Sequence, residues 1–169
     1  LTLSDRRLAE LVQQLETIRH LRRLRLHTRL PIVLPERVND ELLAWLGDTK
    51  LKTVIVAHAN HAQEIDDSVR EALAALKAVG AELLNQSVLL RGVNDSADVL
   101  VALSEKLFEA GVLPYYLHLL DKVQGAAHFG ANETAARQLM VEINKRLPGY
   151  LVPRLVRETP GAPHKVSLT

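Results

Sequence analysis

The hydrophobic positions of this chain form five short runs, and each run stops at a cluster of polar residues. The runs are Leu24–Leu26, Val54–Ala57, Glu82–Leu84, Pro114–Leu117 and Leu151–Val156. The polar clusters that follow them begin at His27, His58, Asn85, His118 and Arg157. Short apolar runs bounded in this way are typical of strands buried in a parallel sheet.

An amphipathic helical segment precedes each run. In the first segment, apolar residues recur every three or four positions at Leu8, Leu11, Val12, Leu15 and Ile18, after Ser4 as a candidate N-cap. Further helices are predicted around Leu42–Leu46, over Ile65–Val79, from Asp95 or Ser96 to Ala110, and from Asn132 to about Leu147. Strands that alternate with helices of this length predict parallel βαβ units, and therefore one α/β domain over residues 1–169.

Prolines, glycines and β-branched residues refine this prediction. Leu30–Pro35 contains two prolines, which predicts an irregular crossing segment, and Gly125–Gly130 and Thr159–Pro163 are predicted loops. Thr53–Ala57 is continuous and β-branched, as expected for a strand buried on both faces. A helix opens the chain, so the first strand has a bare edge, and we expect further strands on its N-terminal side.

Composition excludes several classes of function. The net charge is +1 and aromatic residues make up 4%, which gives neither the basic face nor the stacking surface of a nucleic-acid-binding protein. No apolar run approaches the ~20 residues of a membrane span, and no secretory signal is visible. There is no cysteine, so this chain can form no disulfide and hold no cysteine-bound cluster. We expect a cytoplasmic protein without membrane or nucleic-acid partners.

The first residue is Leu1 and the only methionine is Met140. We therefore expect a processed piece, or the ordered part of a longer protein.

The polar clusters are predicted to meet, because the C-terminal ends of parallel strands lie on one edge of a sheet. His58 and His61 are three residues apart and could share a metal ion, with His118 or His128 as a third ligand. The alternative is that these strand-end groups satisfy the backbone of their loops.

Four more residues at this edge have side chains suited to binding or catalysis. Gln86, within Asn85–Ser87, can donate and accept hydrogen bonds, which suits a ribose or a carboxylate, or a turn. Asp121 and Glu158 follow the fourth and fifth strands, where a carboxylate can bind a cationic amine or remain solvated. Lys165 lies in a loop rich in proline and glycine, where a lysine can form a Schiff base with an aldehyde cofactor, although a lone lysine near a terminus is usually mobile.

Taken together, these segments resemble the C-terminal half of lysine 2,3-aminomutase and its relatives, in particular the bacterial branch that acts in elongation factor P modification. The matching stretches are Thr28–Arg37, His58–Ile65, Asn85–Asp95, Pro114–Tyr116 with Asp121, His128–Phe129, and Tyr150–Pro153 through Pro160–Gly161 to Lys165. The resemblance covers nearly the whole chain, and the Asn85–Asp95 stretch is highly specific.

The resemblance implies an isomerase that converts L-lysine to β-lysine by radical migration of the 2-amino group. The implied cofactors are S-adenosylmethionine (SAM), pyridoxal phosphate (PLP) and a [4Fe–4S] cluster. Lys165 would form the resting Schiff base with PLP, Asp121 and Glu158 would hold substrate amino groups, and Gln86 and His58 would contact SAM. The implied fold is the C-terminal part of a partial (β/α) barrel of the radical SAM type. We also expect a homo-oligomer with a functional link to elongation factor P modification.

The chain departs from the family pattern in three places. Glu158 stands where the aminomutases often have Asp, the loop around Lys165 has fewer glycines, and the three-cysteine motif that holds the cluster is missing. We therefore expect no metal ligands in this chain, and an isolated chain that cannot perform the radical step. Two alternatives stay open: a PLP enzyme that does not use radicals, and an inactive fragment or scaffold that binds a partner through its open edge.

Overall fold

The computed structural model describes residues 1–121 and 127–168. Its sheet has the order β1-β2-β3-β4-β5-β6, so neighbours in sequence are neighbours in space. The parallel strands are β1 (Arg23–Thr28), β2 (Lys52–Ala57), β3 (Glu82–Leu89), β4 (Leu113–Leu119) and β5 (Arg154–Arg157). The short strand β6 (Val166–Ser167) pairs antiparallel with β5. An α/β fold with a mostly parallel sheet is confirmed.

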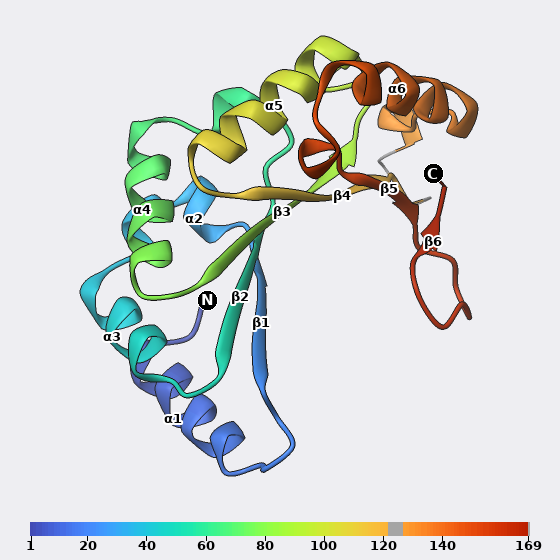
Figure 1. Cartoon of the computed structure of the whole chain (residues 1–169). Coiled ribbons are helices and arrows are strands. Elements are labelled where there is room, and N and C mark those ends of the chain that lie inside the picture. The colour runs from blue at the N-terminus through green and yellow to red at the C-terminus, as the bar shows by residue number, and fades with distance from the viewer. Residues whose placement is uncertain (122–126, 169) are drawn as a thin grey trace.

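The helices lie on one side of this sheet. They are α1 (Asp5–Glu16), α2 (Leu30–Val33), α3 (Asp40–Asp48), α4 (Asp67–Ala78), α5 (Ala97–Glu109) and α6 (Glu133–Arg146). Figure 1 shows the sheet curved into an arch, with the helices outside it and the strands lining the inner, concave side. No helix in the described ranges is long and apolar enough to cross a membrane.

The hydrophobic core lies between the helices and the convex face of the sheet, in two clusters. One cluster joins α1, α3 and α4 to β1–β3 and includes the fully buried Leu42, Ile55 and Leu73. The other joins α5 and α6 to β4 and β5 around residues such as Ile143 and Leu155. Each such side chain contributes about 1.5–3 kcal/mol by leaving water, so burial on the convex side alone can fix the arch.

The predicted helix boundaries depend on caps that the structure mostly confirms. The side chains of Asn39, Ser96 and Asn132 accept hydrogen bonds from backbone N–H groups in the first turns of α3, α5 and α6. Ser4 occupies the N-cap position of α1, but its side chain makes no capping bond. Instead the neighbouring Asp5 is buried and anchors α1.

Asp5 links three distant segments of the chain. Its Oδ1 accepts hydrogen bonds from Arg37 Nη2 at 2.9 Å and from Trp45 Nε1 at 3.0 Å. These bonds hold the pKa of Asp5 below its usual value, although burial opposes them. No local pattern predicts this contact, because the partners are 32 and 40 residues away.

Two predicted elements were wrong in detail. Leu30–Pro35 is not irregular: it contains α2, and a 3₁₀ turn η1 (Pro35–Arg37) follows. Pro31 lies in the first turn of α2, where its missing N–H breaks no helical bond. The fifth strand was predicted from Leu151, but Gly149–Leu151 is the 3₁₀ turn η4 and β5 begins only after Pro153.

Other expectations are confirmed for the described residues. Ile55, Val56 and Ala57 have no exposed surface, so the end of β2 is buried on both faces. Among the described strands, β1 has β2 as its one neighbour, which is the predicted bare edge. The predicted loop Gly125–Gly130 lies partly outside the described residues, and Ala127–Phe129 forms a 3₁₀ turn, η3.

Candidate active site

The alternation of side chains along β3 places the neighbouring polar residues Asn85, Gln86 and Ser87 on two different faces of the sheet. Asn85 and Ser87 are buried on the helix side, so Gln86 between them faces the concave side. The Asn85 side chain accepts a hydrogen bond from Ala59 N at 2.8 Å and donates to Ala59 O at 3.0 Å. Ser87 Oγ also donates to Ala59 O, at 2.8 Å. Asn85 and Ser87 therefore fix the loop after β2, and Gln86 remains available to a ligand.

A second set of bonds completes this loop. Asn60 Oδ1 accepts a hydrogen bond from Val88 N at 2.8 Å, and Asn94 Nδ2 donates to Asn60 O at 2.9 Å. Glu64 Oε1 accepts from the backbone N–H of Asn60 at 2.7 Å, while its Oε2 pairs with Arg29 at 2.5 Å. These hydrogen bonds fix the loop through groups of the protein itself. They also hold His58, which directly precedes the loop, at the end of β2.

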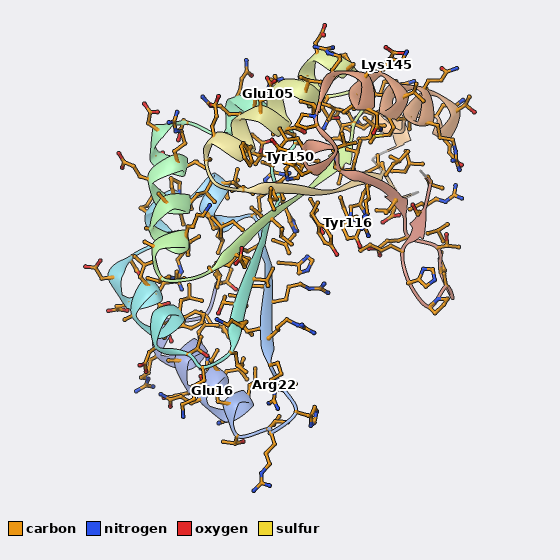
Figure 2. All side chains as sticks on the ribbon, viewed as in Figure 1. Glu16, Arg22, Glu105, Tyr116, Lys145 and Tyr150 are labelled. Atoms are coloured by element: carbon orange, nitrogen blue, oxygen red, sulfur yellow. The ribbon has the colours of Figure 1, made fainter. Side chains whose placement is uncertain are left out.

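A β-bulge decides which face of β4 meets the concave side. The register between β3 and β4 shifts between Asn85 and Gln86, so that Gln86 pairs with Tyr116 and Tyr115 is the extra residue. The rings of Tyr115 and Tyr116 lie 3.8 Å apart between centroids. Figure 2 shows Tyr116 pointing from β4 into the concave side, whereas Tyr150 lies on the side of α5. Bulges that redirect side chains in this way are frequent next to active sites.

The predicted lysine and acids come together at the C-terminal end of β4 and β5. Lys165 Nζ and Glu158 Oε1 form an ion pair across the loop between β5 and β6. Lys165 Nζ also lies 5.7 Å from the centroid of the Tyr116 ring, within the range of a cation–π contact. The hydrogen bond from Lys165 lowers the pKa of Glu158, so this carboxylate is charged at neutral pH.

Asp121 faces the same space as Glu158. Both residues line a hollow of about 820 Å³ whose other walls include Ala131, Glu133 and Arg157. Two smaller hollows lie around Lys165: one of about 230 Å³ is shared with Glu158, and one of about 290 Å³ is shared with Tyr116. The hollow of Lys165 and Tyr116 shares no lining residue with the hollow of Asp121, whereas the hollow of Lys165 and Glu158 shares lining residues with both.

Histidines occupy the rest of the concave rim. The rings of His27 on β1 and His58 after β2 meet edge to face, with centroids 6.0 Å apart. Burial lowers the pKa of His58, and the nearby His27 and Arg29 lower it further. Burial also lowers the pKa of His118, as does Lys165, while Glu158 and Asp121 act in the opposite direction. His58 and His118 are therefore neutral at neutral pH and can each donate and accept one hydrogen bond.

Three buried polar atoms of this rim have no partner. Within residues 1–121 and 127–168, His58 Nε2, Gln86 Oε1 and His118 Nε2 make no hydrogen bond. The Gln86 side chain does interact with His27, which opposes the lowering of the His27 pKa, but Oε1 does not meet hydrogen-bond geometry. Buried polar groups are normally paired, so these three atoms are candidates for contact with a ligand.

The alternative of a zinc site through His58 and His61 receives no support. His61 Nδ1 accepts a hydrogen bond from Gln63 N at 3.1 Å and caps the turn η2 (Ala62–Glu64), which occupies this nitrogen. His128 is exposed beside Phe129. Among the described residues, no group of three or more His, Cys, Asp or Glu side chains is arranged to hold a metal ion.

Sequence reasoning missed His27 and Tyr116 as residues of the site, and considered His118 only as a metal ligand. A usable signal was the alternation of β1, in which His27 lies in the exposed register of Arg23 and Arg25. Tyr116 could not be placed in this way, because the bulge at Tyr115 interrupts the alternation of β4.

Comparison with known proteins identifies relatives over nearly the whole chain, although no family model matches it. The chain is 54% identical to the L-lysine 2,3-aminomutase of Haemophilus influenzae over 95% of its length, and 53% identical to that of Escherichia coli over 97%. It is 35% identical to the L-lysine 2,3-aminomutase of Methanococcus maripaludis over 98% of its length. The matched regions make up 48%, 48% and 38% of those proteins, so the chain spans about half the length of the curated relatives that it matches. By sequence, the chain belongs to the lysine 2,3-aminomutase family.

Proposed function

We propose that these 169 residues are a single domain that forms the C-terminal half of an L-lysine 2,3-aminomutase, an isomerase that converts L-lysine to β-lysine. The observation that carries this proposal is the meeting of Lys165, Glu158 and Asp121 beyond the C-terminal ends of β4 and β5, where Glu158 lines one hollow with Asp121 and another with Lys165. An amine that can hold a carbonyl cofactor lies beside two acids that can hold a cationic substrate. The arched sheet is consistent with part of a (β/α) barrel, and we include that barrel in the proposal.

The residues around Lys165 fit PLP. The primary amine lies at the wall of two hollows, against the face of the Tyr116 ring, and the loop that carries it turns at Gly161 with φ of +81°. PLP, when bound, supplies a carbonyl carbon that takes up the migrating nitrogen. Glu158 and Tyr116 would keep the amine of Lys165 directed into the hollow before the cofactor arrives.

Glu158 and Asp121 would bind the substrate. L-Lysine carries two ammonium groups, and each charge-assisted hydrogen bond to a carboxylate contributes about 1.5–3 kcal/mol. Glu158 is paired with Lys165 in the structure. When the Lys165 amine turns toward the cofactor it would leave Glu158, and a substrate ammonium would take its place beside this carboxylate. One carboxylate would thus serve the lysine and the substrate in turn.

His58 and Gln86 fit the polar groups of SAM. Their unpaired Nε2 and Oε1 atoms can bond a ribose hydroxyl or an amino-acid group. The sequence contains no cysteine, so the chain offers no thiolate to a [4Fe–4S] cluster, and no step through a cluster is derived for it. We assign cluster ligation to residues outside this chain. The homo-oligomeric state, the cytoplasmic location and the link to elongation factor P modification are supported only by the resemblance to the family.

Reductive trapping tests the cofactor assignment. The chain is incubated with PLP and borohydride, and the modified residue is identified by mass spectrometry. We expect modification at Lys165, and its loss in Lys165→Ala with an unchanged melting temperature. Lys145→Ala is the matched control, because Lys145 is also paired with a glutamate but lies on the far side of the sheet, on α6. Modification spread evenly over surface lysines would refute the assignment.

Product analysis tests the reaction. The chain alone, given L-lysine, PLP, SAM and a reductant, should form no β-lysine, because it lacks thiolates for the cluster. A protein that also contains the cysteine motif should form it and should take up iron. PLP trapping at Lys165 without iron uptake in that longer protein would favour a PLP enzyme that does not use radicals.

A further inference from the structure

His118 on β4 carries a buried nitrogen that nothing in the described protein satisfies. The residue is 8% exposed, and its Nε2 has no hydrogen-bond partner in the ranges 1–121 and 127–168. Leaving such a group unpaired is costly, so its presence needs a reason. None of the roles proposed so far uses His118.

The neighbours of His118 explain why the nitrogen is unpaired. In the register of the sheet, His118 lies beside Val88 on β3 and Val156 on β5. Neither valine can form a hydrogen bond, so the imidazole is flanked by apolar side chains at its own level. His118 lies on the concave side with Gln86 and Tyr116, and its Nε2 is covered, so a partner would reach it from that side once a neighbouring side chain moves.

The β-bulge is what turns His118 toward that side. Without the extra residue at Tyr115, Gln86 would pair with Tyr115, and every later side chain of β4 would change face. Leu117 would then enter the site and His118 would enter the core of α5 and α6. The fold thus includes a local irregularity whose effect is to present this imidazole together with Tyr116.

The charged and titratable groups around His118 come from several elements. Lys165 and Glu158 face it from the β5–β6 segment, Asp121 from the end of its own strand, and His58 from the end of β2. The Tyr116 ring lies 5.7 Å away between centroids. Because burial and Lys165 disfavour a second positive charge here, the ring is neutral and offers one N–H donor.

We propose that His118 binds the cofactor, with its Nε2–H donating a hydrogen bond to the phenolic oxygen of PLP while Lys165 holds the carbonyl carbon. The inference rests on the proposed function. In PLP the phenolic oxygen is attached to the ring carbon next to the one that bears the aldehyde. The His118 ring centroid and Lys165 Nζ each lie 5.7 Å from the centroid of the Tyr116 ring, so a donor at His118 is close to the place where this oxygen would lie when Lys165 holds the aldehyde carbon. The bond would keep the cofactor ring in one orientation against Tyr116.

The test is a binding comparison with two ligands: PLP and 3-deoxypyridoxal phosphate, which keeps the aldehyde and phosphate but lacks the phenolic oxygen. Absorbance titrations are run on the chain and on His118→Phe, His118→Gln and the control His20→Phe, which changes an exposed histidine at the opposite end of the strands. We expect His118→Phe to weaken PLP binding about ten-fold and to leave binding of the deoxy ligand unchanged. His118→Gln, which retains an N–H donor, should lose less, and His20→Phe should behave as the unaltered chain.

If His118 had a purely structural role, His118→Phe would lower the melting temperature of the chain without cofactor, whereas the binding role predicts no decrease. Phe removes an unpaired polar atom from between two valines, so His118→Phe should melt no lower than the unaltered chain without cofactor. Equal weakening for both ligands, or none for PLP, would overturn the inference while leaving PLP on Lys165 intact. If His118→Phe fails to fold, the same ligand comparison is made with His118→Leu, which also lacks an N–H donor. If the unaltered chain shows no absorbance band that depends on Lys165, the proposed function and this inference both fail.

Discussion

The convex and concave faces of the sheet differ in whether their buried polar side chains have hydrogen-bond partners. On the convex side, the Asn85 side chain makes three hydrogen bonds, to both backbone groups of Ala59 and to Ser87 Oγ. On the concave side, one position further along β3, Gln86 Oε1 has no partner in the described part of the chain, and the same holds for His58 Nε2. Adjacent residues on the same strand therefore differ in whether the protein itself completes their bonding.

This difference separates residues that hold the fold from residues to which we assign a ligand in the proposed function. A satisfied network stabilises the apo-protein, and its removal leaves backbone groups exposed to an apolar interior. An unsatisfied group costs stability, and its removal should cost none. The faces can thus be told apart by which measurement a substitution changes: unfolding on the convex side, and binding on the concave side.

The largest effect on unfolding is expected from Asn85→Ala. It removes three hydrogen bonds and leaves the N–H of Ala59 unpaired, although Ala59 O keeps its bond from Ser87 Oγ, so the free energy of unfolding should fall by about 2–4 kcal/mol. Gln86→Ala is the matched control on the neighbouring residue and should change it by less than about 0.5 kcal/mol. Urea denaturation measures both. Similar losses in the two variants would mean that the faces do not differ as described.

Removing one acid of the site should mainly affect substrate binding. Asp121→Asn keeps the shape but loses the charge, and should weaken L-lysine binding by about 1.5–3 kcal/mol, or at least ten-fold, in the PLP-loaded protein. Asp98→Asn is the control, because Asp98 is an exposed acid paired with Arg146 on the helix layer. Calorimetric titration distinguishes them, and an unchanged affinity in Asp121→Asn would remove it from the substrate site.

His58→Phe tests the SAM side of the rim. The substitution should weaken binding of S-adenosylhomocysteine, a stable analogue, by about 1 kcal/mol, or roughly five-fold, because one hydrogen bond is lost. The melting temperature without ligand should not fall, since Nε2 is unpaired there. His61→Phe serves as the comparison and should instead lower stability, because His61 caps η2. A drop in melting temperature for His58→Phe, with unchanged binding, would make His58 structural.

The smallest effect is a dependence of stability on pH. The folded-state pKa values of His27, His58 and His118 lie below the ordinary 6.5, so the unfolded chain binds protons first as the pH falls. The free energy of unfolding should be constant above about pH 7 and should decrease below pH 6.5, levelling off once the folded histidines are also protonated. Asp5 and Glu158 have lowered pKa values and act in a separate, more acidic window. In the double variant His58→Phe with His118→Phe, the free energy of unfolding should decrease less steeply as the pH falls below about 6.5. An equally steep decrease would show that these two histidines are not its source.

The sequence was informative where local rules decide the structure. The alternation of strands and helices, the caps at Asn39, Ser96 and Asn132, and the glycines that end α4 and α5 all act within a few residues. The placing of Glu158 and Asp121 at one edge followed from the common direction of parallel strands, whereas Lys165 is held there by the antiparallel strand β6. Apart from the position of Lys165, each of these features could be predicted without knowing how distant segments pack.

Features that depend on distant contacts could not be predicted. The contact of Asp5 with the neighbours of α1 forms only when Arg37 and Trp45 have been brought beside it. The side of the sheet on which His118 lies depends on a register shift that the sequence of β4 does not indicate. Alternation predicts that Asn85 and Gln86 lie on opposite faces of β3, but it does not predict which of the two faces the helices. Register and long-range pairing are set by the packed core rather than by local propensity.

The bare edge of β1 has a consequence for how the chain behaves in concentrated solution. An unpaired strand edge can template pairing with another copy, but Arg23 and Arg25 are exposed on this strand and give every copy the same positive charge there. Two edges that approach each other must bring four guanidinium groups together. This repulsion extends only about 10 Å at 0.1 M salt and about 3 Å at 1 M. In the 169-residue chain by itself these arginines should oppose pairing of two such edges, and turbidity should rise with ionic strength sooner when both are replaced by threonine.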